Sequence, residues 1–112
     1  MITYADISII DGGYFDIIEA REYFIVLRSK TTGHYWYLLE QEANGHRTFQ
    51  IKHRHNKTAP YHPQKNKANI AACCEYIKEH DAFHLERVKR QKQKRLDRLS
   101  IGAPDNDLRT LS

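Results

Sequence analysis

Short runs in which apolar and polar residues alternate, separated by turn-forming residues, fill the first half of the chain. This alternation has the two-residue period of a β-strand, in which successive side chains point to opposite faces of a sheet. It predicts a short first strand at residues 5–11, followed by strands at residues 14–20, 23–29, 34–40 and 47–53.

Turn signals separate these runs and favour a meander of neighbouring antiparallel strands. Gly12 and Gly13 form a flexible break, and the stretch 30–33 ends in a glycine that can supply a positive φ. Asn44-Gly45 is the strongest hairpin signal, because a type I′ turn needs positive φ at both central positions.

After residue 55 the pattern changes. The stretch 56–65 contains Pro60 and Pro63 with few apolar residues, which predicts a surface loop. Asn66 is the predicted cap of a helix at residues 67–79, which has apolar residues at helical spacing: Ile70, Cys73, Cys74 and Ile77.

A second helical stretch follows, either restarted or continued at Asp81. Its apolar stripe is thinner, and Lys92 stands where the stripe should continue. The apolar members are Leu85, Val88, Leu96 and Leu99.

These elements predict an α+β fold, in which an antiparallel meander of three to five strands packs against a C-terminal helix. We expect one domain at residues 1–85, a basic helical extension at residues 86–100 and a flexible tail at residues 101–112. With 112 residues, the chain is too short for two independent cores.

Composition supports a folded domain: 40% of the residues are hydrophobic, and seven Tyr, four Phe and one Trp are present. No apolar run reaches the roughly 18 residues of a membrane span, and the N-terminus lacks a signal-peptide pattern. We therefore expect a cytoplasmic protein that does not bind a membrane. The two adjacent cysteines, Cys73 and Cys74, form neither a disulfide framework nor a CxxC pair.

Charge is distributed unevenly. Residues 1–42 carry three basic and seven acidic side chains, whereas residues 43–74 carry six basic side chains and no acid. Residues 86–98 carry seven basic side chains against two acids. Two separate basic blocks favour a polyanionic partner, and nucleic acid is the commonest one in the cytoplasm.

The strands also predict where such a partner would bind. Residues 34–39 carry large rings on both faces of the sheet, and we expect one face to lack a helical cover. Rings beside cations suit single-stranded nucleic acid, because every base has a π-face and every linkage a negative charge. The predicted aromatic platform is Tyr35, Trp36 and Tyr37. The predicted nucleic-acid-binding residues are Arg28, Gln50, Lys52, Arg54, Lys57, Arg87, Lys89, Arg90, Lys94 and Arg95.

A second geometry places the sheet in the major groove of DNA. In that geometry Gln50, Lys52 and Arg54 would read base edges, since Arg matches guanine and Gln matches adenine. The sequence leaves open whether the partner is DNA or RNA.

Structural roles and a protein partner are the main alternatives. Rings on both faces of a strand also occur when both faces are buried or when one forms a homodimer interface, and a charged helix is often only solvated. An accessory or inhibitor protein could use the aromatic face to bind a larger protein, since Tyr, Trp and Arg carry much interface energy.

Metal binding and catalysis are less favoured. His53, His55 and His62, with Cys73 or Cys74, could form a zinc site, but their spacing is not a recurrent zinc motif. No nucleophile elbow, phosphate loop or HExxH motif is present, and the acids lie far in sequence from the histidines. We therefore expect a non-enzymatic protein without a metal or other cofactor.

Overall fold

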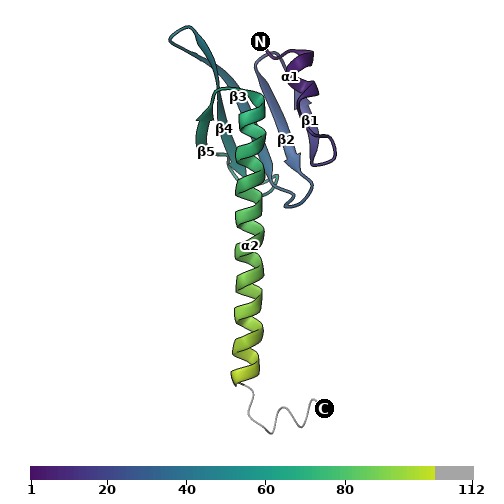
Figure 1. Ribbon diagram of the computed structural model, residues 1–112, viewed down its shortest axis with the longest axis vertical. Coiled ribbons are helices and arrows are strands. Elements are labelled where there is room, and N and C mark those ends of the chain that lie inside the picture. Colours follow the sequence, from purple (N-terminus) through teal and green to yellow (C-terminus); the bar gives the residue numbers. More distant parts are fainter. Residues whose placement is uncertain (103–112) are drawn as a thin grey trace. The chain divides into compact units, whose positions relative to one another are not determined.

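The computed structural model describes residues 1–102, with side chains to Ser100, and within them one five-stranded antiparallel sheet and two helices (Figure 1). The strands are β1 (Phe15–Ala20), β2 (Phe24–Ser29), β3 (Tyr35–Ala43), β4 (His46–Arg54) and β5 (His62–Lys67), and they lie in the sheet in sequence order. The helices are α1 (Tyr4–Ser8) and α2 (Ile70–Gly102). The predicted α+β meander backed by a C-terminal helix is confirmed.

The β3–β4 hairpin is the longest pairing, with nine residue pairs between Tyr35↔Arg54 and Ala43↔His46. Its turn residues Asn44 and Gly45 have φ of 53° and 76°, as a type I′ turn requires. The local turn signal therefore fixes the register of the two strands that carry most of the predicted site.

The first predicted strand, at residues 5–11, is wrong, because residues 4–8 form α1. Thr3 caps this helix: its hydroxyl accepts from the Asp6 backbone N–H at 3.2 Å, and the Asp6 carboxylate accepts from the Thr3 N–H at 2.8 Å. This reciprocal capping box satisfies two N–H groups that a short helix would otherwise leave unpaired.

The predicted loop at 56–65 is also partly wrong, since its last residues belong to β5. Pro63 is tolerated there because β5 is an edge strand. Asn66 lies in this strand opposite Gln50 and does not cap the helix. Asn69 does so instead, with its side-chain oxygen accepting from the Ala72 N–H at 2.8 Å.

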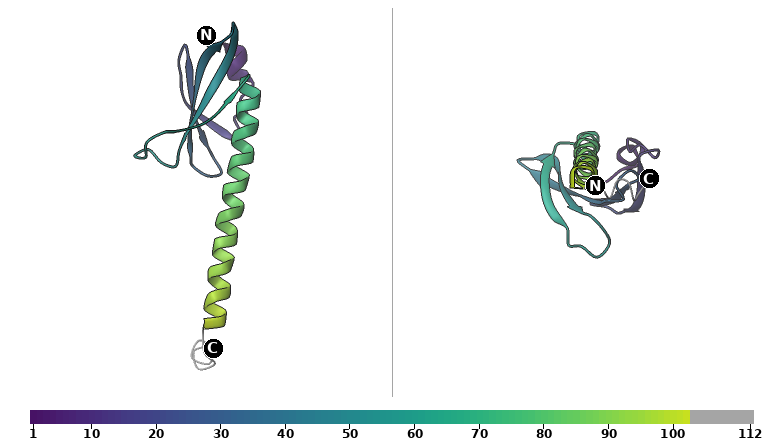
Figure 2. Two further views of the ribbon diagram at one scale, coloured as in Figure 1. Left: turned by 90° about the vertical axis from the view of Figure 1, so that its left-hand side faces the viewer. Right: turned by 90° about the horizontal axis from the view of Figure 1, so that it is seen from below.

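The predicted helix at 67–79 and the second helical stretch form one continuous helix, α2. The start of α2 lies against one face of the sheet (Figure 2). Trp36, Leu38 and Ile51 from the sheet pack with Ile70 and Ile77 from α2, and all five are at most 1% exposed. Burying each such side chain contributes roughly 1.5–3 kcal/mol.

Contacts divide the chain into two compact units, Met1–Asp81 and Ala82–Ser112. The first contains the sheet, α1 and the start of α2. The second begins inside α2, and the predicted tail at 101–112 lies outside the described residues from residue 103 onward. Neither described helix is long and apolar enough to cross a membrane.

Candidate functional site

The candidate site lies on the face of the sheet opposite to the one that packs on α2, which we call the open face. Trp36 and Leu38 belong to the core that packs on α2, and the alternate residues Tyr35 and Tyr37 point to the opposite face. Tyr37 is partly exposed there, but Tyr35 is only 7% exposed beside Arg28 and Arg54, so its assignment to an exposed platform is corrected.

Strand register surrounds these two tyrosines with cations. Arg54 and Lys52 of β4 are the direct partners of Tyr35 and Tyr37, and Arg28 of β2 is the partner of Tyr35 on the other side. Directly paired side chains lie on the same face of a sheet. The structure thus brings together five of the predicted residues on one surface, and Gln50, two residues before Lys52, shares it.

The cations lie over the rings. The Arg54 guanidinium carbon is 5.2 Å from the ring centroid of Tyr35 and 4.4 Å from that of Tyr61, and Lys52 Nζ is 5.7 Å from that of Tyr37. Positive charge within about 6 Å of a ring face is attracted by the ring quadrupole. Arg54 is therefore held between two rings.

Arg54 and the three tyrosine rings, but not Lys52, border a hollow of about 370 Å³ on the open face. Its apolar wall includes Phe24, whose ring stacks on Tyr37 at 5.0 Å, and its charged residues are Glu19, Arg54 and Lys57. The complete lining is Ile18, Glu19, Phe24, Val26, Tyr35, Tyr37, Arg54, Lys57 and Tyr61.

Arg54 has hydrogen-bonding capacity that the protein does not use. Its Nη1 donates to the Lys57 carbonyl at 3.0 Å, but its buried Nε has no hydrogen-bond partner. No carboxylate among residues 1–102 forms an ion pair with Arg54, Lys52 or Lys57. Arg54 therefore keeps a positive charge that no carboxylate of residues 1–102 neutralises in the lining of the hollow, and this charge favours an anionic ligand there.

Tyr61, which sequence reasoning did not select, completes the aromatic part of the site. Its ring centroid is 5.7 Å from that of Tyr37, with the planes tilted by 58°. Burial raises the pKa of Tyr61, and the nearby Arg54 charge offsets part of that increase. The available signal was an aromatic residue between Pro60 and Pro63 in the acid-free stretch.

Trp36 does not lie on the open face, so its assignment to the exposed platform is corrected. It is fully buried on the helix-facing side, where its Nε1 donates to Ser29 Oγ at 3.0 Å. Its ring stacks on His53 with centroids 4.1 Å apart. Adjacent residues of a strand point to opposite faces, so Tyr35, Trp36 and Tyr37 cannot form one surface.

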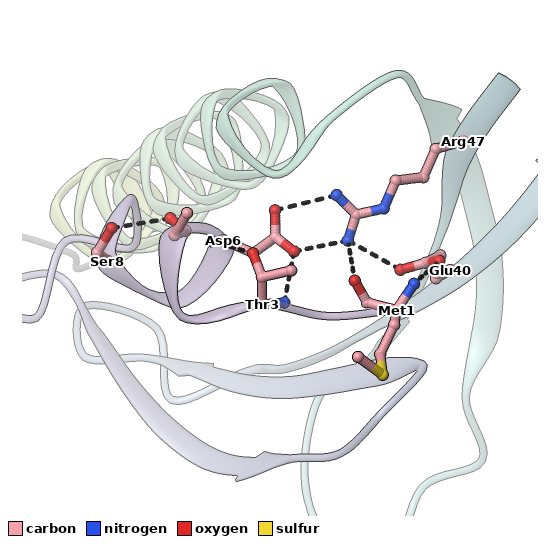
Figure 3. Close-up of polar contacts among 7 residues, drawn as sticks. Met1, Thr3, Asp6, Ser8, Glu40 and Arg47 are labelled. Atoms are coloured by element: carbon pink, nitrogen blue, oxygen red, sulfur yellow. Dashed lines mark hydrogen bonds and ion pairs between the residues drawn. The ribbon is translucent and has the colours of Figure 1, made fainter.

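The acid-free stretch 43–74 does not form a single basic surface. Arg47 is engaged by Asp6 at 2.6 Å, by Glu40 at 2.8 Å and by the Met1 carbonyl at 2.9 Å (Figure 3). Lys65 and Lys67 pair with Ile51 and Phe49, whose side chains face the core, and so lie on the helix side of the sheet.

The histidines and cysteines of the weighed zinc site do not form one group of ligands, although the ring centroids of His53 and His55 lie 4.9 Å apart. His53 contacts His34 through Nε2 and Nδ1 at 2.9 Å on the helix-facing side, whereas the cysteines lie in the core. Burial raises the pKa of Cys73 to about 12 and that of Cys74 to about 11, which favours the thiol over the metal-binding thiolate. Within residues 1–102 no group of three or more His, Cys, Asp or Glu is arranged to hold a metal ion.

A larger hollow, of about 640 Å³, lies beside α1 and is lined mainly by apolar residues. Its charged side chains are Arg21 and Glu22, and Arg21 already pairs with Glu19 at 2.7 Å. It lacks the uncompensated cations of the open face.

The second unit carries the other predicted cations. At helical spacing, Arg87, Arg90 and Lys94 share one side of α2 with Arg98, whereas Lys89 and Arg95 lie elsewhere on its circumference. The opposite side carries Leu85, Val88, Leu96 and Leu99, which are 42–64% exposed. Three of the five predicted helix cations therefore lie on one side of α2, and the other two lie away from that side.

Comparison with known proteins gives no match: no protein-family model matches the chain, and no curated protein or solved structure is significantly similar to it. Function is therefore inferred from the geometry and charge of the open face and of α2.

Proposed function

We propose that this protein binds nucleic acid without catalysing a reaction, through the open face of its sheet and the cations of α2. The observation that carries the proposal is the set Lys52, Arg54 and Lys57, uncompensated by any carboxylate of residues 1–102, beside Tyr37 and Tyr61.

Nucleic acid fits this combination better than other anions. A simple phosphate or an acidic peptide would use the cations but not the partly exposed rings of Tyr37 and Tyr61 next to them. A polynucleotide supplies both a repeated negative charge and flat aromatic bases, each of which interacts favourably with one part of the open face.

Helix α2 supports the same partner independently. Arg87, Arg90, Lys94 and Arg98 recur every three or four residues along one side of the helix. The helix rises about 1.5 Å per residue, so successive cations are about 4.5 or 6 Å apart along its axis. Such a row of cations suits contact with the repeated negative charge of a nucleic-acid backbone.

The test is fluorescence anisotropy of labelled single-stranded and double-stranded DNA and RNA with the full chain across a salt series. We expect affinity to fall with salt, because binding releases counterions. The variant Lys52→Gln/Lys57→Gln should lower the salt slope by about 0.7–0.9 for each lost phosphate contact.

The matched control is Lys65→Gln/Lys67→Gln, which removes the same charge from the other side of the sheet. It should change the slope much less than Lys52→Gln/Lys57→Gln. Equal effects of the two double variants would argue against the open face, and an absence of binding at low salt would remove nucleic acid as the partner.

A protein partner is the second candidate. It is favoured by apolar residues that adjoin the cations, in particular Ile18, which is 51% exposed and lines the same hollow as Phe24. An accessory or inhibitor protein of this kind would depend on buried apolar contact more than on charge. Its binding would be weakened strongly by Tyr37→Ala and only slightly by salt.

A further inference from the structure

We infer that the hollow on the open face is a subsite for one unstacked base and its adjoining phosphate, so that the protein selects single-stranded over double-stranded nucleic acid. This inference rests on the proposed function and specifies its ligand. The subsite is formed by Tyr37 and Tyr61 with Arg54 and Lys57.

The two tyrosine rings give the hollow a base-binding shape. Their centroids are 5.7 Å apart and their planes are tilted by 58°, so they form two walls and not a closed stack. Phe24 stacks on one face of Tyr37 and Arg54 lies over one face of Tyr61, so a base would stack on the remaining face of one ring with its edge against the other. The volume of about 370 Å³ falls in the range of small-molecule sites, roughly 300–1,000 Å³.

The cations are placed at the phosphate end of such a ligand. Arg54 is fixed between Tyr35 and Tyr61 and by its bond to the Lys57 carbonyl, so little side-chain freedom is lost on binding. Lys57 is exposed on the loop that precedes β5 and lines the same hollow. Together they supply one fixed and one adaptable positive charge.

A double helix cannot use this subsite without opening. Its bases are stacked on their neighbours, and their π-faces are covered, whereas the bases of a single strand can be splayed onto aromatic side chains.

The experiment compares two labelled single strands of equal length and charge: an oligothymidylate and an oligomer of abasic deoxyribose phosphates. Base stacking on an aromatic side chain should make the full chain bind the oligothymidylate roughly 5- to 150-fold more tightly. A duplex of the same length should bind more weakly than the oligothymidylate.

Four tyrosine variants locate the effect: Tyr61→Leu, Tyr61→Phe, Tyr37→Leu and Tyr23→Leu. Tyr61→Leu should abolish most of the preference for the oligothymidylate, and Tyr61→Phe should retain it because the ring is kept. Tyr23→Leu is the control, since Tyr23 is 55% exposed but does not line the hollow. Circular dichroism and thermal unfolding would verify that each variant is folded.

The outcomes separate this inference from the proposed function. Equal affinity for the two single strands, with normal salt dependence, would overturn the subsite and leave nucleic-acid binding intact. A preference that survives in both Tyr61→Leu and Tyr37→Leu would overturn its location. Failure of the oligothymidylate to bind would overturn the subsite, and failure of duplexes and RNA as well would overturn the proposed function.

Discussion

At the scale of single residues, neighbours decide whether a cation is available to a partner. Arg47 and Arg54 belong to the same strand, β4, but only Arg47 is neutralised, by Asp6 and Glu40. Both contacts raise the pKa of Arg47 well above its ordinary value. Arg54 meets tyrosine rings in place of carboxylates and keeps its charge for a partner.

The Asp6–Arg47 contact predicts acid-sensitive stability. The hydrogen bond from Arg47 lowers the pKa of Asp6 from 3.8 to about 2. Because the pKa of Asp6 is lower in the folded state than in the unfolded state, its ionised carboxylate stabilises the fold fully above the unfolded-state pKa. That stabilisation is lost as the pH falls from about 4 to about 2. Asp6→Asn should lower the free energy of unfolding at neutral pH by about 2 kcal/mol and reduce the loss between those pH values. Urea unfolding across this pH range measures both effects.

Asp16→Asn is the control for that experiment. Asp16 forms only long surface contacts, 3.9 Å to Arg28 and 3.8 Å to Lys30, and such pairs are worth about 0–1 kcal/mol. If Asp6→Asn and Asp16→Asn lowered the free energy of unfolding by the same small amount, Arg47 would not be held as the structure indicates. Arg47 would then count among the cations available to a partner.

At the scale of elements, sequence predicts what short-range signals determine. The β3–β4 hairpin follows from Asn44-Gly45, and the strand alternation identifies which side chains of β4 face away from the core. Strand β5 could not be predicted in this way. Its pairing with β4 is a long-range contact, and Pro63 is compatible with a strand only because β5 lies at an edge.

The candidate site shows the same division. Lys52, Arg54 and Tyr37 could be placed together because strand period and hairpin register are local properties. Tyr61 could not, since its position depends on how the loop after β4 returns to the sheet. The side on which Trp36 lies also depended on which face α2 covers, which the strand pattern alone does not specify.

The apolar stripe of α2 in the second unit makes a prediction about association. Lys92 interrupts the stripe formed by Leu85, Val88, Leu96 and Leu99, which otherwise follows a three-and-four spacing typical of a coiled coil. Lys92→Leu should therefore increase self-association of the full chain. Sedimentation equilibrium of the variant and the unaltered chain measures the change.

Lys94→Leu provides the matched control, because it makes the same replacement on the opposite side of the helix. It should associate no more than the unaltered chain does. Equal association of both leucine variants would indicate a general gain in hydrophobicity, and no gain for Lys92→Leu would mean that the stripe is not a coiled-coil seam.

At the scale of the whole molecule, the two basic sets belong to different compact units, and in the proposed function each set would make its own contacts to phosphates of the nucleic acid. Electrostatic contacts of this kind add in the salt slope, whatever the sequence of the polymer. The sheet cations also act beside aromatic rings, whereas the cations of α2 lie on a side of the helix that carries mainly polar residues. The two sets should therefore differ in selectivity.

A combined charge-removal experiment tests this difference. Arg87→Gln/Arg90→Gln/Lys94→Gln should lower the salt slope by up to about 2–3 and weaken single and double strands alike, because phosphate contacts carry no base information. Adding Lys52→Gln/Lys57→Gln should lower the slope further by about the amount measured for that double variant alone. Anisotropy titrations with matched single and double strands give the salt slopes of the unaltered chain, the helix variant, the sheet variant and the combined variant. A helix variant with an unchanged slope would assign binding to the open face alone. Loss of single-strand preference in the helix variant would instead move base recognition to α2.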